Sequence, residues 1–226
     1  VIDYDNASGT KKPDGTTYGT TGSATATIEA DGFTARDLTF SNSFDRAAHP
    51  EITATQAVAV KATGDRQYYD RVRFLGHQDT LYADTRAVGT RARQYYRGSE
   101  IVGDVDFIFG RATAVFDQVT IRALNRGGDP NGYITAASTP QENPFGYVFL
   151  NCKLTGEGEP QAYLGRPWRD FAAVAFIFPF TGLSATTVLI GLVAYSLVIL
   201  VRNFLAGLQG VPADVREAAK GMGYGS

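Results

Sequence analysis

Two stretches, Ala-Asp-Gly-Phe-Thr-Ala-Arg-Asp-Leu-Thr-Phe at residues 30–40 and Gly-Asp-Arg-Gln-Tyr-Tyr-Asp-Arg-Val-Arg-Phe at residues 64–74, share one pattern. Each has a glycine, a polar turn, an aromatic residue and then an alternation of apolar and polar residues. Alternation with a period of two is typical of half-buried β-strands. The recurrence of this unit predicts coils that stack on one another, because a solenoid buries its apolar positions only against neighbouring coils.

Further short apolar runs, separated by Gly, Asp or Asn, continue this pattern. They occur at residues 25–30, 58–60, 72–75, 106–109, 115–116, 119–121 and 147–150. The sequence before residue 170 has no amphipathic helical period of useful length, so we expect this part of the chain to be all-β. A parallel β-helix fits the repetition, and a β-sandwich is the structural alternative.

The charge balance and the cysteine content exclude several classes of protein. The 226 residues include 21 basic and 23 acidic side chains, for a net charge of −2. Without a basic surplus to neutralise phosphates, nucleic acid is not expected as a partner. Cys152 is the single cysteine, which excludes an intrachain disulfide framework and a cysteine-based zinc site. It falls at an inward position of an expected strand, where we expect it to be a packing residue.

The charged residues are distributed unevenly along the chain. Residues 1–170 hold 39 of the 44 charged side chains, and residues 171–201 hold none. Within that segment, residues 183–201 are 19 uncharged and mostly apolar positions, about the length that spans a bilayer, with Arg202 directly after them. We therefore expect a hydrophobic α-helix there, with membrane association through 183–201. A buried helix of a soluble domain is the alternative.

Four motifs combine polar, titratable and aromatic residues. They are Gln56-Ala-Val-Ala-Val, Gly76-His-Gln-Asp-Thr-Leu-Tyr82, Gly103-Asp-Val-Asp-Phe-Ile-Phe-Gly110 and Leu164-Gly-Arg-Pro-Trp168. Together they resemble the pectin methylesterases over about residues 1–177, with Tyr133-Ile-Thr-Ala-Ala-Ser-Thr as a supporting phrase of the bacterial type. The resemblance implies a right-handed parallel β-helix, methyl-esterified homogalacturonan (pectin) as the substrate, an extracellular or cell-surface location, and neither a metal nor an organic cofactor.

The ends of the chain depart from the family pattern. No signal peptide is visible in this sequence, and the opening coils and last strands of the family are absent from it. We therefore expect a β-helix truncated at both ends, a loss that can abolish activity.

An ester can be opened by a carboxylate nucleophile if a second carboxyl group protonates the departing alcohol. This chemistry requires surroundings that keep one carboxyl group ionised and the other protonated. By resemblance, Asp106 is the nucleophile that attacks the methyl ester carbonyl and forms an acyl-enzyme anhydride. Asp79 gives its proton to methanol and then deprotonates the hydrolytic water.

The resemblance also assigns roles to residues around this pair. Arg166 is expected to pair with Asp106, to hold it ionised and to orient it. The amides of Gln78 and Gln56 are expected to donate to the oxyanion of the tetrahedral intermediate. Flat apolar surface for the sugar is expected from three aromatic residues, Tyr82, Phe109 and Trp168.

Each of these residues also has a purely structural interpretation. An aspartate in a turn-rich β protein most often bonds its own backbone, and we expect this turn role for Asp104. Arg166 could be a structural ion pair, and Trp168 could belong to the core. His77 is interpreted as a structural residue because the family chemistry assigns it no proton transfer.

The last part of the chain resembles a different family. Residues 180–226 are similar to the permease subunit of an osmoprotectant ABC importer, beginning at Phe180-Thr-Gly-Leu-Ser, with Glu217-Ala-Ala and Gly223 similar to its coupling motif. We therefore expect an esterase-like domain over 1–177 and a permease-like segment over 178–226, joined as a chimera. An ATPase subunit is a partner only if the permease segment is genuine.

Two other functions remain open from the sequence. One is a membrane transport component, carried by the last segment. The other is a pectate lyase or polygalacturonase on the same type of β-helix, because paired carboxylates also suit glycosidic cleavage.

Overall fold

The structure is a computed structural model that describes residues 1–128, 131–140, 142–158, 162–168 and 174–177. These residues lie in one compact unit over Val1–Phe178. The predicted hydrophobic helix at 183–201 and the whole permease-like segment lie outside the described residues, so both stay predictions. In the part of the chain that the structure describes, no helix is long and apolar enough to cross a bilayer.

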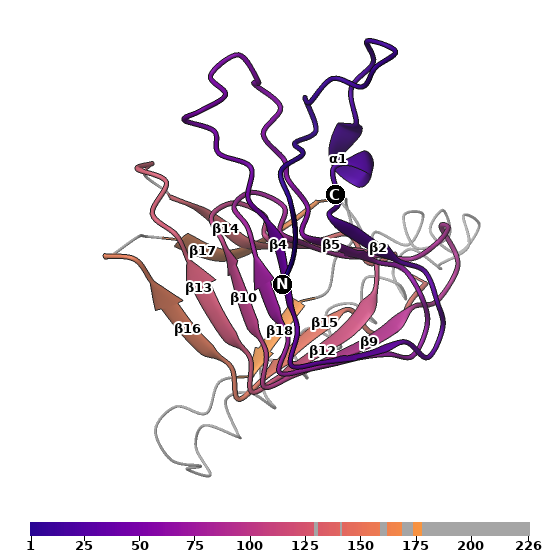
Figure 1. Cartoon of the computed structure of the whole chain (residues 1–226). Helices are drawn as coiled ribbons and strands as arrows, with labels where there is room; N and C mark the ends of the chain where they lie inside the picture. Colours follow the sequence, from indigo (N-terminus) through magenta and orange to yellow (C-terminus); the bar gives the residue numbers. More distant parts are fainter. Residues whose placement is uncertain (129–130, 141, 159–161, 169–173, 178–226) are drawn as a thin grey trace, which may run out of the picture. The chain divides into compact units, whose positions relative to one another are not determined.

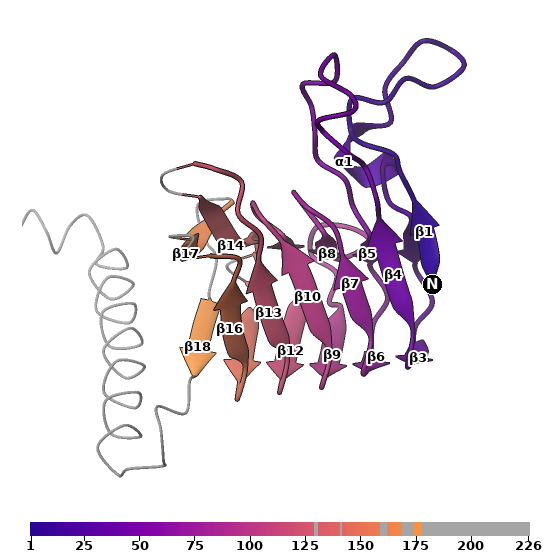
Figure 2. The ribbon, with the colours of Figure 1, turned by 60° about the vertical axis from the view of Figure 1, so that its left-hand side comes forward.

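The predicted parallel β-helix is confirmed. Each coil contributes one strand to each of three parallel sheets, and Figure 1 shows the three sheets surrounding a common interior. All of the pairs between named strands are parallel, which rules out the β-sandwich alternative. Figure 2 shows the strands of the first sheet lying side by side along the coil axis.

The three sheets are as follows, in chain order of their strands. Sheet 1 contains β1 (Ile2–Tyr4), β4 (Thr39–Asn42), β7 (Arg73–Leu75), β10 (Glu100–Gly103), β13 (Thr120–Ala123) and β16 (Lys153–Gly156). Sheet 2 contains β2 (Ala26–Ile28), β5 (Val60–Ala62), β8 (Leu81–Ala83), β11 (Ile108–Gly110), β14 (Gly132–Ala137) and β17 (Ala162–Pro167). Sheet 3 contains β3 (Thr34–Arg36), β6 (Gln67–Asp70), β9 (Arg93–Arg97), β12 (Thr113–Asp117), β15 (Tyr147–Leu150) and β18 (Val174–Ile177). The one described helix is the short α1 (Gly19–Gly22), in the connection before β2.

An aromatic stack runs through the interior along sheet 3. Tyr69, Tyr96, Phe116 and Phe149 occupy the same register position in four successive strands. Their rings stack at centroid distances of 4.8, 4.8 and 4.5 Å, and all four side chains are buried. Every second residue of a strand points inward, and the same stacking from coil to coil follows from the parallel register.

Buried glutamines close the corner between sheets 2 and 3. The Gln67 amide donates to the carbonyls of Ile28 and Ala30, both at 3.0 Å, and its oxygen accepts from the Tyr69 hydroxyl at 2.9 Å. One coil further on, Gln94 repeats the arrangement with Ala62, Asp84 and Tyr96. These side chains donate to backbone carbonyls at the ends of the strands and in the turns after them. The corner can therefore be buried without leaving these carbonyls unpaired.

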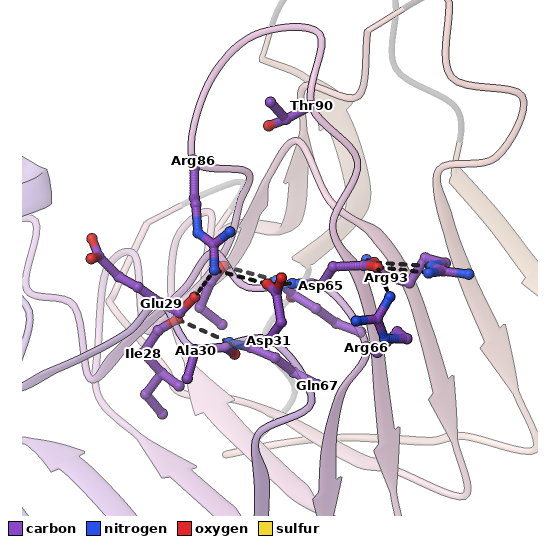
Figure 3. Close-up of polar contacts among 12 residues, drawn as sticks. Ile28, Glu29, Ala30, Asp31, Asp65, Arg66, Gln67, Arg86, Thr90 and Arg93 are labelled. Carbon is purple, nitrogen blue, oxygen red and sulfur yellow. Dashed lines mark hydrogen bonds and ion pairs between the residues drawn. The ribbon is translucent and has the colours of Figure 1, made fainter.

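Outside the same corner, an ion-pair network fixes the turn after β5 (Figure 3). The Asp65 carboxylate accepts two hydrogen bonds from the Arg93 guanidinium, at 2.9 and 2.6 Å, and one from Arg66 at 3.1 Å. Arg86 contacts Asp31 at 2.8 Å and the Glu29 carbonyl. This network joins turns of three successive coils.

Replacing Phe116 with alanine is expected to lower the free energy of unfolding by about 3–5 kcal/mol, because it removes a ring from the middle of the interior stack. Urea unfolding monitored by circular dichroism measures the change. Tyr95→Ala is the matched control, since Tyr95 lies on the outer face of the same sheet and is 37% exposed. We expect a loss of at most about 1 kcal/mol there, and equal losses for the two variants would contradict the described interior.

Candidate active site

Asp79 and Asp106 occupy equivalent positions in successive coils. The register pairs Leu81 with Ile108, so the aspartates two residues before them lie next to each other along the coil axis. The Asp79 N–H donates to the Val105 carbonyl at 3.0 Å, which holds the two turns together. Both aspartates precede strands of sheet 2 and both are buried, with 7% of each residue exposed.

Both aspartates have a left-handed backbone conformation. Their φ angles are +67° at Asp79 and +50° at Asp106. Among residues with a side chain, aspartate and asparagine tolerate this conformation best, because their short polar side chains bond locally. Gly103 brings the two turns close together, since a Cβ there would lie 2.5 Å from the His77 carbonyl oxygen. The backbone conformation at this corner therefore favours aspartate at positions 79 and 106, and Gly103 allows the two turns to approach closely.

Arg166 forms a two-point ion pair with Asp106. Its Nε donates to Oδ1 at 2.9 Å and its Nη2 donates to Oδ2. Arg166 comes from β17, two coils beyond the strand that follows Asp106. The Tyr133 ring lies under the guanidinium, 5.0 Å from ring centroid to Cζ. This fork geometry fixes the orientation of the Asp106 carboxylate.

Asp79 has the opposite electrostatic environment. Burial, and then the negative charge of Asp106, raise the pKa of Asp79 to about 8, while Arg166 acts in the opposite direction. The carboxyl group of Asp79 is therefore protonated at neutral pH. A protonated carboxyl group beside a second carboxyl group that is held by an arginine is the arrangement that acid–base chemistry at an ester needs.

Gln78 and Gln56 lie on neighbouring segments beside the aspartates. The Gln78 carbonyl accepts from the Ala57 N–H at 3.0 Å, which joins the turn before β8 to the connection between β4 and β5. The Gln78 side-chain oxygen accepts from the Thr55 hydroxyl at 3.1 Å. The side-chain oxygen of Gln56 is buried and has no hydrogen-bond partner among the described residues. An oxyanion role for the two amides stays a prediction.

The three aromatic residues expected to contact the sugar lie together. Tyr82 and Phe109 stack at 4.2 Å, and Trp168 packs edge-on against both, at 6.3 and 5.6 Å. Tyr82 and Phe109 are only 8% and 2% exposed, so Trp168, at 44%, supplies most of the accessible ring surface. The interpretation of Trp168 as a core residue is wrong.

Asp104 does not have the turn role that we expected from its sequence context. Its buried carboxylate contacts the Arg46 guanidinium at 2.5 Å and the His77 ring at 3.5 Å, so that interpretation is wrong and the structural interpretation of His77 fits. Two further residues of the site were not predicted from the sequence. Arg126 Nη1 lies 3.8 Å from Asp104 Oδ1, and the Tyr133 ring lies under the Arg166 guanidinium. The interval of 27 residues that separates Asp79 from Asp106 also leads from Asp106 to Tyr133, and this repeat could have found the tyrosine.

The structure gives no candidate metal centre. Over the described ranges, no three His, Cys, Asp or Glu side chains are grouped so that they could hold a metal ion. The absence of a cofactor stays a prediction.

Comparison with known families identifies the fold and the motifs together. The pectinesterase family model matches residues 6–184, so the chain belongs to the pectinesterase family. The match includes residues 180–184, which our sequence analysis assigned to the start of a permease-like segment. The comparisons therefore support the esterase resemblance and give no support to the permease resemblance.

Individual relatives agree with this assignment. The chain is 40% identical over 150 residues to a pectinesterase of Ralstonia nicotianae, covering 64% of this chain and 38% of that protein. It is 39% identical over 186 residues to pectinesterase A of Dickeya dadantii, covering 74% and 49%. The chain thus spans less than half the length of these curated relatives.

Solved structures show the same fold. A pectin methylesterase from Yersinia enterocolitica superposes with a TM-score of 0.71 at 37% identity, covering 77% of this chain and 62% of that one. A pectin methylesterase in complex with a hexasaccharide also gives a TM-score of 0.71, at 34% identity and with coverage of 77% and 58%.

Replacing Asp79 with asparagine is expected to remove a pH dependence of stability. Between pH values of about 4 and 8, the Asp79 carboxyl group is protonated in the folded chain and ionised in the unfolded chain. Because the folded state binds more protons in this range, the contribution of Asp79 to the free energy of unfolding falls as the pH rises.

Urea unfolding at pH 5 and at pH 8 measures this effect. We expect the wild-type chain to lose on the order of a few kcal/mol more than Asp79→Asn between the two pH values. Asparagine keeps the size of the side chain and tolerates the positive φ angle, so the turn itself is retained. Equal losses in the two proteins would mean that Asp79 titrates normally.

Proposed function

We propose that this chain carries the catalytic centre of a pectin methylesterase, which hydrolyses methyl esters of homogalacturonan to pectate and methanol. The observation that carries the proposal is the contrast between two neighbouring aspartates. Asp106 is held by the Arg166 guanidinium, whereas Asp79 is buried with its pKa raised to about 8. Membership of the pectinesterase family, and relatives whose names state this activity, support the same reaction.

The first half of the reaction uses both aspartates. A carboxylate oxygen of Asp106 attacks the carbonyl carbon of the methyl ester and forms a tetrahedral intermediate. Gln78 and Gln56 donate to its oxyanion. When the intermediate collapses, the bond to the methoxy oxygen breaks and Asp79 gives its proton to that oxygen. Methanol leaves, and the sugar carboxyl group is joined to Asp106 as an anhydride.

The second half reverses the proton transfer. Asp79, now ionised, takes a proton from water as that water attacks the anhydride carbonyl. The bond to the Asp106 oxygen breaks, which releases the galacturonic acid carboxyl group and restores the Asp106 carboxylate with its partner Arg166. The released carboxyl group then loses its remaining proton to the solvent. Asp79 is again protonated, so the cycle closes without any other reactant.

The substrate surface in this proposal combines Trp168 with its supports, Tyr82 and Phe109. A sugar ring has an apolar face that packs on an aromatic ring, and polar contacts then fix its orientation. The complex of a related pectin methylesterase with a hexasaccharide supports an oligosaccharide ligand of this kind. Pectin is an extracellular polymer, so the proposed site of action is outside the cell. Membrane association through 183–201 and an ATPase partner stay predictions about residues that the structure does not describe.

Asp106→Asn is expected to abolish methanol release from methylated pectin, because an amide cannot form the anhydride. Methanol and polymer length are measured in the same samples. Asp37→Asn is the matched control: Asp37 is an arginine-bonded aspartate with a φ angle of +51°, and it is exposed and precedes a strand of sheet 1. We expect this control to keep wild-type turnover. Unsaturated or shortened oligomers without methanol would instead indicate a lyase or a glycosidase.

The rate of methanol release is expected to fall on the alkaline side of about pH 8. Asp79 must be protonated to give a proton to the leaving methanol, and above its raised pKa it no longer is. A profile of kcat/KM between pH 5 and pH 10 measures this limb. A rate that stays constant up to pH 10 would exclude Asp79 as the acid.

A further inference from the structure

The carboxylate of Asp104 is fully buried two residues before Asp106. Its side chain has no exposed surface, and two arginines and one histidine surround it. Arg46 Nη2 lies 2.5 Å from Oδ2, His77 Nδ1 lies 3.5 Å from Oδ2, and Arg126 Nη1 lies 3.8 Å from Oδ1. A buried carboxylate with two arginine neighbours is the centre of an ion-pair cluster rather than a turn cap.

This carboxylate joins three separate connections of the coil. Arg46 belongs to the connection between β4 and β5, His77 to the turn between β7 and β8, and Arg126 to the connection between β13 and β14. Burial raises the pKa of Asp104, but the contacts with His77 and Arg46 lower it by more than this. The net pKa of Asp104 therefore lies below its usual range. Asp104 is therefore anionic at neutral pH and supplies the counter-charge for Arg46 and Arg126, which come from two of these connections.

One of these contacts leads directly to Gln78. Arg126 Nη1, the nitrogen that faces Asp104, donates to the Gln78 side-chain oxygen at 3.4 Å. The Thr55 hydroxyl donates to the same oxygen at 3.1 Å. Because a guanidinium can only donate, the oxygen of the Gln78 amide must face Arg126. The NH₂ end of the amide is then the end that can donate to an oxyanion.

We propose that Asp104 is a positioning residue, which holds Arg126 against Gln78 and thereby fixes the orientation of the Gln78 amide. The inference rests on the proposed function, because Gln78 acts there as an oxyanion donor. Without the charge of Asp104, Arg126 loses its counter-ion and the amide of Gln78 can turn over. Its oxygen would then face the oxyanion, and two acceptors repel each other.

The test is a double-mutant cycle with Gln78. Asp104→Asn keeps the size of the side chain and is expected to lower kcat for methanol release about tenfold, less than the loss of a whole oxyanion donor. In the Gln78→Ala background the same change should alter kcat by less than about twofold, because the group through which Asp104 acts is gone. Equal losses in both backgrounds would assign Asp104 to general stability and overturn the proposal.

A second variant guards against misfolding of Asp104→Asn. Arg126 is 34% exposed at its side chain, so Arg126→Met leaves the buried carboxylate paired with Arg46 and His77. Its loss of kcat should also disappear in the Gln78→Ala background. An undiminished loss there would contradict the proposed link through Arg126.

Asp65→Asn is the matched control. Asp65 also holds arginines in a multipoint network (Figure 3), but it follows β5, whereas Asp79 and Asp106 precede β8 and β11 at the other end of the strands of sheet 2. We expect Asp65→Asn to leave kcat within about twofold of its parent in both backgrounds. A coupling with Gln78 as large as that of Asp104 would overturn the specific role of Asp104.

Nuclear magnetic resonance gives a readout that does not depend on activity. The chain has eight glutamines, and the side-chain amide signals of Gln78 are those that disappear in Gln78→Ala after selective ¹⁵N labelling. In Asp104→Asn these signals should shift and show faster motion on the ps–ns timescale. If the wild-type chain releases no methanol, the proposed function fails, and this spectrum still tests the positioning. Unchanged Gln78 signals in Asp104→Asn would overturn it.

Discussion

Backbone hydrogen bonds between successive coils hold the strands parallel and in register, as in the pairs β8 with β11 and β11 with β14. Because the register is fixed, equal positions of neighbouring coils carry side chains that touch. Inside the coil this repetition produces the aromatic stack that includes Phe116 and Phe149. At the corner before sheet 2 it places Asp79 beside Asp106. The core and the candidate active site therefore have one origin, and a shift of one residue in a coil would disturb both.

Proximity alone would make the two aspartates equivalent, and their neighbours make them different. Arg166 reaches Asp106 from two coils away and satisfies both of its carboxylate oxygens, whereas the carboxyl group of Asp79 is left in a buried position beside a negative charge. A third aspartate, Asp104, lies in the same turn as Asp106 and pairs with Arg46. Two corners with the same backbone geometry therefore have different electrostatic surroundings, and the proposed roles of acid and nucleophile depend on this difference.

Much of this arrangement could be predicted from the sequence. The alternation around Phe40 and Phe74 predicted the strands, and the motifs around Asp79, Asp106 and Arg166 predicted residues that the fold brings together. The surroundings of Asp104 could not be predicted, because its partners Arg46 and Arg126 come from connections that no local pattern joins to residue 104. The shielding of Tyr82 and Phe109 beneath Trp168 was also beyond sequence reasoning, since their exposure depends on a strand that begins some 50 residues after Phe109.

The positive φ angles at Asp79 and Asp106 suggest how a catalytic site can arise in evolution at the corner of this coil. Other corners of the same solenoid place Asp37, Arg71, Gln118 and Asn151 in the same left-handed region. Aspartate and asparagine tolerate this conformation better than most side chains, so a backbone with such bends can carry carboxyl groups, or side chains one substitution away from them, at several points along its length. In such a scaffold, a catalytic site does not need to replace a structural residue. It can begin at an aspartate that the bend already accommodates, once a neighbouring coil supplies an arginine.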